Sequence, residues 1–221
     1  SIGSEDENLL DPGDTPEENL QFLVFLTCVI SAVDDYQDLL RMSVASCGND
    51  HRLGAHEAPP AIISIFLGDE LSDIIDALAE GHEAGHASRE SLDFGVAVLP
   101  TFDRDTTDRN RTSPFAFTGN KFEFRMPGSA VNVADANTML DTAVAKALKD
   151  FADAMDERGD ASFESAAIAY IRKSLAAHKR ILFSGDGYSE EWHEEAVRRG
   201  LCNFPTTADA LPAFVEQKNI D

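Results

Sequence analysis

Five basic residues are clustered in a 22-residue segment of this acidic chain, and their spacing is suited to binding anionic groups. They are Arg104, Arg109, Arg111, Lys121 and Arg125. In an extended segment, alternation places Lys121, Glu123 and Arg125 on one face. The other face carries Phe122, Phe124 and Met126. Two cations beside a carboxylate can hold phosphate or a substrate carboxylate, with the carboxylate on a divalent metal ion. An ion-pair ladder on a solvated face would have the same spacing.

A second candidate is the polar loop 49–60, which contains Arg52 and Glu57. Gly54 permits a turn, and the pair Pro59-Pro60 stiffens the end of the loop. This pattern predicts a mobile arm on an anchored base, of the kind that often closes over a reaction. An ordinary polar connection is the alternative.

A third pattern, His82-Glu83-Ala84-Gly85-His86, matches the H-E-x-x-H zinc motif. Gly81 and Gly85 each disfavour a helix by about 1 kcal/mol relative to alanine, so a solvated loop is the better interpretation. A zinc hydrolase using His82, Glu83 and His86 remains an alternative enzyme. The other histidines lack metal-like spacing and are predicted to be surface or hydrogen-bonded residues: His51, His56, His178 and His193.

Two of these segments resemble glutamine synthetases. The run from Arg109 to Ser113, followed by Lys121-Phe122-Glu123-Phe124-Arg125, is similar to their arginine-rich segment and Arg-x-Glu-x-Arg strand. The residues Arg52-Leu53 and Glu57-Ala58-Pro59 are similar to their glutamate-bearing flap. The order and spacing are most similar to the type III enzymes. The resemblance covers essentially the whole chain and implies a C-terminal catalytic portion that lacks the N-terminal half.

This resemblance implies a reaction in which ATP phosphorylates L-glutamate and ammonia then displaces phosphate. Mg²⁺ or Mn²⁺ would be the cofactor, with Glu123 as a metal ligand. The resemblance implies that Arg52 and Arg125 bind substrate carboxylates and that Arg111 and Lys121 bind ATP. Glu57 and Arg111 would be catalytic, with Glu57 accepting a proton from ammonium. A homo-oligomeric ring with shared active sites is also implied, so the fragment alone is expected to be inactive. A non-catalytic glutamine-synthetase-like protein is the alternative.

The amino-acid composition indicates which classes of binding partner and which cellular compartment to expect. The chain has 221 residues and a formal net charge of -22, which argues against nucleic acid and against an anionic membrane surface as partners. The apolar run from Leu20 to Val33 is too short to span a membrane, and no signal peptide is recognisable. Three widely spaced cysteines indicate reduced thiols and a cytoplasmic location. The acidity also suits a saline cytoplasm.

The elements that must position these residues follow from periodicity and turn residues. Helices are expected at 15–33, 38–43, 69–79, 135–157, 163–182, 189–199 and 207–217, with Thr15 capping the first. Strands are expected at 61–67 and 93–99, and in a hairpin that turns at Gly119-Asn120. The segment 46–60 is expected to be a loop. The order of these elements predicts an α+β fold with a helical C-terminal part. The resemblance implies that residues 1–156 are part of a glutamine synthetase catalytic domain, with an antiparallel sheet and packed helices, and that residues 157–221 are a helical C-terminal region, incomplete at its end.

Overall fold

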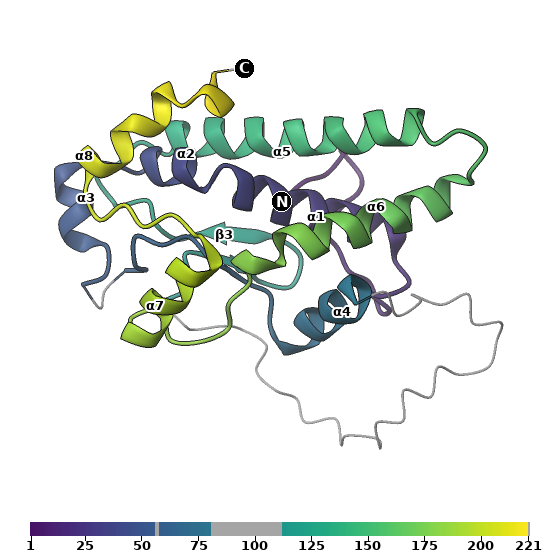
Figure 1. The fold of residues 1–221 in the computed structure, drawn as a ribbon, viewed down its shortest axis with the longest axis horizontal. Coiled ribbons are helices and arrows are strands. Elements are labelled where there is room, and N and C mark those ends of the chain that lie inside the picture. Colours follow the sequence, from purple (N-terminus) through teal and green to yellow (C-terminus); the bar gives the residue numbers. More distant parts are fainter. Residues whose placement is uncertain (56–57, 81–111, 221) are drawn as a thin grey trace.

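The computed structural model describes residues 1–55, 58–80 and 112–220 (Figure 1). Several sequence-predicted features lie outside the described residues: the strand 93–99, the motif residues His82, Glu83 and His86, and the candidate site residues Glu57 and Arg111.

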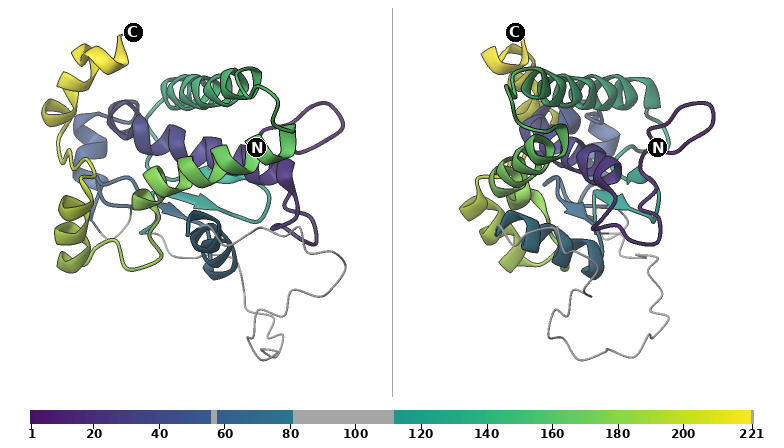
Figure 2. Two further views of the ribbon diagram at one scale, coloured as in Figure 1. Left: turned by 45° about the vertical axis from the view of Figure 1, so that its right-hand side comes forward. Right: turned by 90° about the vertical axis from the view of Figure 1, so that its right-hand side faces the viewer.

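The central element is α1 (Leu20–Asp35), whose apolar side chains are buried on almost every side. It lies between α5 (Val133–Asp156) and α6 (Phe163–His178), and the three helices run side by side (Figures 1 and 2). The Phe22 ring also packs against Phe117 of the sheet, with 6.0 Å between ring centroids. The all-round apolarity of this segment predicted a buried helix, which is confirmed.

The predicted start of α1 at Thr15 is wrong. Residues 16–18 form a turn in which the Glu18 amide donates to the Thr15 oxygen at 3.1 Å. The helix begins at Leu20 because the Asn19 side chain accepts from the Phe22 amide at 3.0 Å, which satisfies a donor that has no partner inside the helix. Asn19 is an equally good capping residue and stands directly before the apolar run.

The described residues contain one sheet of three strands in the order β1 (Ile65–Phe66), β2 (Phe115–Phe117) and β3 (Phe122–Phe124). β2 and β3 form the predicted antiparallel hairpin, and Gly119 has the positive φ, 96°, that its turn requires. The prediction of an antiparallel sheet is wrong for β1, which pairs with β2 in parallel. The connection between these two strands includes a helix, as a parallel crossover requires.

The segment 46–60 is not a loop throughout, because α3 (Cys47–Arg52) occupies its first part. The Ser46 hydroxyl accepts from the Asn49 amide at 3.1 Å and caps this helix. A six-residue helix is too short to show apolar periodicity, which explains why the sequence did not predict it. By contrast, α4 (Asp69–Ala79) has the expected bounds.

The C-terminal part is helical, as expected. α6 ends at His178 and continues as the 3-10 turn η1 (Lys179–Ile181), and α7 (Glu190–Arg199) follows. The expected helix 207–217 is divided into α8 (Thr207–Ala210) and the 3-10 segment η2 (Leu211–Val215), because Pro212 cannot donate a helical hydrogen bond. The remaining elements are α2 (Gln37–Met42), which matches its prediction closely, and η3 (Gln217–Asn219).

Two further expectations bear on the whole chain. Cys28, Cys47 and Cys202 are free thiols, as predicted. Within the described residues, no helix combines the length and the apolarity needed to cross a bilayer.

Candidate functional site

The candidate site lies at the edge of the sheet where β1 and β2 begin and β3 ends. Since β1 and β2 run in parallel and β3 runs against them, residues before the first two strands and after the third gather at this edge. The Arg125 amide donates to the Pro114 oxygen at 2.8 Å and closes the edge between β2 and β3. Residues that are far apart in the sequence are thereby brought together.

Arg52, the last residue of α3, reaches this edge with its side chain. Its Nη1 donates to the Met126 oxygen at 3.0 Å and to Asn49 Oδ1 at 3.2 Å. Because Met126 follows Arg125, the Arg52 side chain reaches the backbone directly after the other predicted substrate-binding arginine. No functional role was predicted for Asn49, whose only signal in the sequence is its place one turn before Arg52.

Glu123 and Arg125 lie on one face of β3, as the alternation predicted. Phe122 and Phe124 pack against the core on the other face. Arg125 Nη2 and Nε each lie 3.3 Å from Glu123 Oε2. The side chain of Glu123 is 44 % exposed and that of Arg125 is 21 % exposed. An ion pair is therefore present, although within one strand rather than across two, and the carboxylate remains open to solvent.

Lys121 lies apart from this group. It is exposed and closes the hairpin turn, where its oxygen accepts from the Thr118 amide at 2.9 Å. Four residues separate it from Arg125, which corresponds to roughly 13 Å along a strand. Lys121 lies in the turn before β3 and Arg125 follows its end, so the two cations stand at opposite ends of the strand and do not flank one small ligand.

The described residues that adjoin Glu57 and Arg111 are buried or hydrogen-bonded. The Gly54 amide donates to the Pro59 oxygen at 3.0 Å, across the segment that contains Glu57. Ala58, Pro59 and Pro60 are buried, as is Thr112, which follows Arg111. The prediction that the two prolines anchor the base of this loop is consistent with this hydrogen bond.

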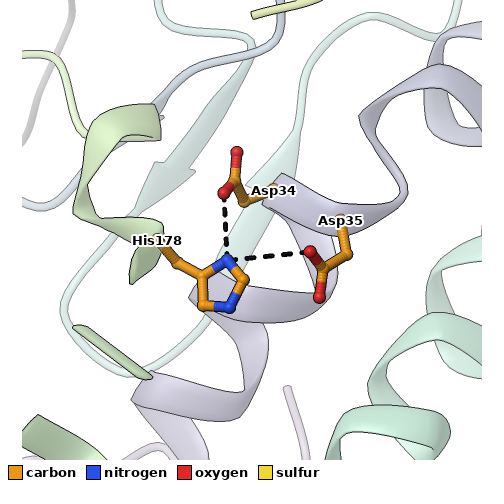
Figure 3. Close-up of side chains that lie close together, drawn as sticks. All are labelled: Asp34, Asp35 and His178. Carbon is orange, nitrogen blue, oxygen red and sulfur yellow. Dashed lines mark hydrogen bonds and ion pairs between the residues drawn. The ribbon is translucent and has the colours of Figure 1, made fainter. Parts of the chain in front are cut away.

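A second group of titratable residues lies at the end of α1, where Asp34 and Asp35 face His178 of α6 (Figure 3). His178 Nδ1 lies 3.0 Å from Asp34 Oδ2 and 3.7 Å from Asp35 Oδ1. The hydrogen bond to Asp34 raises the pKa of His178, and burial raises the pKa of Asp35. The prediction that His178 is a hydrogen-bonded residue is therefore confirmed.

These three side chains could offer ligand atoms to a metal ion, since the atoms lie within 4.8 Å of one another. However, Arg180 Nε donates to both Asp34 oxygens, at 3.0 and 2.9 Å. A dication would have to compete with this guanidinium and with the proton of His178. The group is therefore best described as an ion-pair network that ties α1 to the end of α6.

Further buried charges, which the sequence did not lead us to expect, lie on α2. Asp38 Oδ2 accepts from Lys218 Nζ at 2.9 Å. The buried Arg41 donates from Nε to the Phe204 oxygen and from Nη2 to Asp50 Oδ1, both at 2.8 Å. The signal in the sequence is the helical spacing of Asp34, Asp38 and Arg41, since charges rarely stand on a buried face without partners.

The chain is similar in sequence to glutamine synthetases over nearly its whole length. The profile of the glutamine synthetase C-terminal domain matches residues 166–221. The type-3 glutamine synthetase of Dictyostelium discoideum is 48 % identical over 214 residues, which cover 96 % of this chain and 29 % of that protein. The glutamine synthetase of Butyrivibrio fibrisolvens is 47 % identical over 220 residues, 97 % of this chain and 30 % of the relative. That of Bacteroides fragilis is 43 % identical over 217 residues, with coverages of 96 % and 30 %. The chain thus spans less than a third of the length of these relatives.

Proposed function

Because the chain belongs to the glutamine synthetase family, we propose that the protein carrying it joins ammonia to L-glutamate, with ATP as co-substrate and L-glutamine, ADP and phosphate as products. The observation that carries this proposal is the hydrogen bond from Arg52 to the Met126 oxygen, which brings Arg52 to the end of β3 where Arg125 pairs with the half-exposed carboxylate of Glu123.

Arg52 and Arg125 are proposed to hold the carboxylates of glutamate. A guanidinium presents its N–H donors in a planar fork that matches a carboxylate. Met126 and Asn49 orient the Arg52 fork, and the Glu123 carboxylate orients that of Arg125. Two arginines that are already oriented can bind a dicarboxylate with little further ordering.

Glu123 is proposed to hold a divalent ion, Mg²⁺ or Mn²⁺. A carboxylate oxygen is a ligand that both ions accept, and the exposure of the Glu123 side chain is compatible with metal binding. When bound, such ions neutralise charge on a transferring phosphoryl group. Arg125 would then keep the second carboxylate oxygen in place.

Glu57, Arg111 and Lys121 complete the proposal. Glu57 would accept the proton of ammonium, and Arg111 would stabilise charge on the phosphates of ATP. Lys121 would also bind ATP, from the hairpin end of β3. We further propose that residues 1–156 belong to the catalytic domain and that residues 157–221 form a helical region. The complete protein would assemble in the cytoplasm as a ring of identical subunits with shared active sites. Residues 1–221 alone would then show no turnover.

The test is glutamine formation by the protein expressed from its complete coding sequence, with ATP, ammonia and Mg²⁺. Glu123→Gln removes the charge but not the shape of the side chain, and we expect it to lower kcat about a hundredfold or more. Glu195→Gln is the matched control, because Glu195 pairs with Arg199 on α7. If the wild-type protein makes no glutamine, the proposed activity is wrong, and a non-catalytic glutamine-synthetase-like protein is favoured. Stoichiometric bound zinc that is lost when His86 is mutated would instead favour the alternative of a zinc hydrolase.

A further inference from the structure

The four-residue turn 185–188, which follows η1 in the C-terminal region, touches both chain segments that lead into the candidate site. Tyr188 donates its hydroxyl to the Ala58 oxygen at 2.8 Å. Ala58 is fully buried and comes seven residues before β1. The first contact of the turn is therefore with the entry to β1.

The second contact is with the entry to β2. The Gly187 amide donates to Thr112 Oγ1 at 3.0 Å, and Thr112 Oγ1 lies 3.4 Å from the Gly185 oxygen. A Cβ atom on Gly187 would lie 2.9 Å from the Thr112 oxygen and 3.4 Å from Pro60 Cδ. The backbone of the turn therefore fits between the two segments so closely that a side chain on Gly187 would displace one of them.

The turn is itself mounted on the sheet. Leu182 bridges to Ile65 in parallel, and the Phe183 amide donates to the Ile65 oxygen at 2.9 Å. The Phe183 ring stacks on the buried Trp192, with 3.7 Å between centroids. These contacts fix the chain immediately before the turn, so the turn can hold other segments in place.

We propose that the 185–188 turn is a positioning element for the reaction proposed above, with Tyr188 as its positioning residue. This inference rests on the proposed function. Ala58 and Thr112 directly follow the candidate catalytic residues Glu57 and Arg111 in the chain. Tyr188 acts through the backbone of Ala58, and Gly187 acts through Thr112. The C-terminal region thereby contributes to the active site without supplying a reacting group.

Tyr188→Phe tests this role in the protein expressed from its complete coding sequence, since it removes one hydroxyl and keeps the ring. Loss of one hydrogen bond that holds a reacting segment should lower kcat for glutamine formation about three- to tenfold. The KM for ATP should change less than about twofold, because the Tyr188 hydroxyl bonds the backbone of Ala58, which adjoins the proposed general base Glu57. More phosphate should be released for each glutamine formed, because a misplaced site admits water to the acyl phosphate. Tyr170→Phe is the matched control, since Tyr170 packs on Phe151 of α5, away from this edge.

Hydrogen exchange of the same proteins gives a readout that does not depend on activity. Peptides covering 58–66 and 112–117 should exchange faster in Tyr188→Phe and at the wild-type rate in Tyr170→Phe. Gly187→Ala should produce the same changes more strongly, through the close approach to Thr112. Gly187→Ala therefore tests the proposal even if the effect of Tyr188→Phe is too small to measure.

The outcomes separate the two proposals. Faster exchange with unchanged kcat and unchanged phosphate release in both variants would overturn the positioning role and leave the proposed function intact. Unchanged exchange in both variants would also overturn it. A wild-type protein without glutamine formation would refute the proposed function, and the catalytic role of the turn with it.

Discussion

The Arg52 guanidinium donates a hydrogen bond to the Met126 oxygen at 3.0 Å, although 74 residues separate the two positions in the chain. The same oxygen accepts from Asn49 Nδ2 at 3.1 Å, and Asn49 Oδ1 accepts from Arg52. These contacts join the end of α3 to the end of β3. They place Arg52 beside Met126, which directly follows Arg125, and both arginines are proposed to bind the substrate.

Asn49→Ala should therefore weaken glutamate binding and also destabilise the fold. Asn49 is buried and bonds Val44, Met126 and Arg52, so its loss leaves two backbone oxygens with one bond fewer. We expect a loss of about 1–3 kcal/mol in the free energy of unfolding. The KM for glutamate should rise more than the KM for ATP. Steady-state kinetics and urea unfolding would measure the two effects, with the exposed Asn137→Ala as control. An unchanged KM for glutamate would mean that Arg52 does not contact this substrate.

Glu57→Ala should lower kcat for glutamine formation while changing the affinity for ATP little. The side chain is proposed to remove a proton from ammonium, and general-base catalysis of this kind contributes about 10²–10⁴ in rate. Phosphate release and glutamine formation, followed together, would reveal the expected rise in uncoupled ATP hydrolysis. A large loss of ATP affinity at unchanged kcat would assign Glu57 to the nucleotide site instead.

His178→Gln should destabilise the protein more in acid than in base. The hydrogen bond to Asp34 raises the pKa of His178 in the folded state above its ordinary value of 6.5. The stabilisation from the bond between protonated His178 and Asp34 is complete below pH 6.5, and it is lost as the pH rises through the folded-state pKa of His178. The difference in unfolding free energy between wild type and variant should be larger at about pH 5.5 than at about pH 8.5. A pH-independent difference would show that the imidazolium is not the stabilising form.

Asp50→Asn should have the opposite pH dependence. Burial raises the pKa of this carboxyl, but hydrogen bonds from Arg41 and Thr207 together outweigh it, and the pKa is lowered below 3.8. The stabilisation is present above pH 3.8 and disappears as the pH falls through the folded-state pKa. At neutral pH the variant leaves the buried Arg41 without its ion-pair partner Asp50, and we expect a loss of about 3 kcal/mol. Chemical unfolding across this range would test the sign, with Asp160→Asn, at an exposed position between α5 and α6, as control.

The net charge of -22 predicts a strong response to salt. Screening weakens repulsion among carboxylates, so the thermal midpoint should rise between low salt and about 1 M KCl. Scanning calorimetry at several KCl concentrations would measure it. A flat or falling midpoint would argue against adaptation to a saline cytoplasm.

The sequence by itself determined the features that depend on neighbouring residues. The bounds of α4, the hairpin turn at Gly119 and the two faces of β3 were all predicted, because apolar periodicity and turn residues act over a few positions. The motifs around Arg52, Glu123 and Arg125 also identified the family correctly. The start of α1 was misplaced because Thr15 and Asn19 are both good caps.

Only the tertiary structure decided which distant segments meet. The parallel pairing of β1 with β2 results from a long crossover, and this pairing gathers Ala58, Thr112 and Arg125 at one edge of the sheet. Lys121 and Arg125 lie at opposite ends of β3, so only Arg125 stands at this edge. The partners of Asn49, Tyr188 and Asp34 lie 77, 130 and 146 residues away along the chain. Such contacts depend on how the elements pack, and local sequence patterns carry no information about that packing.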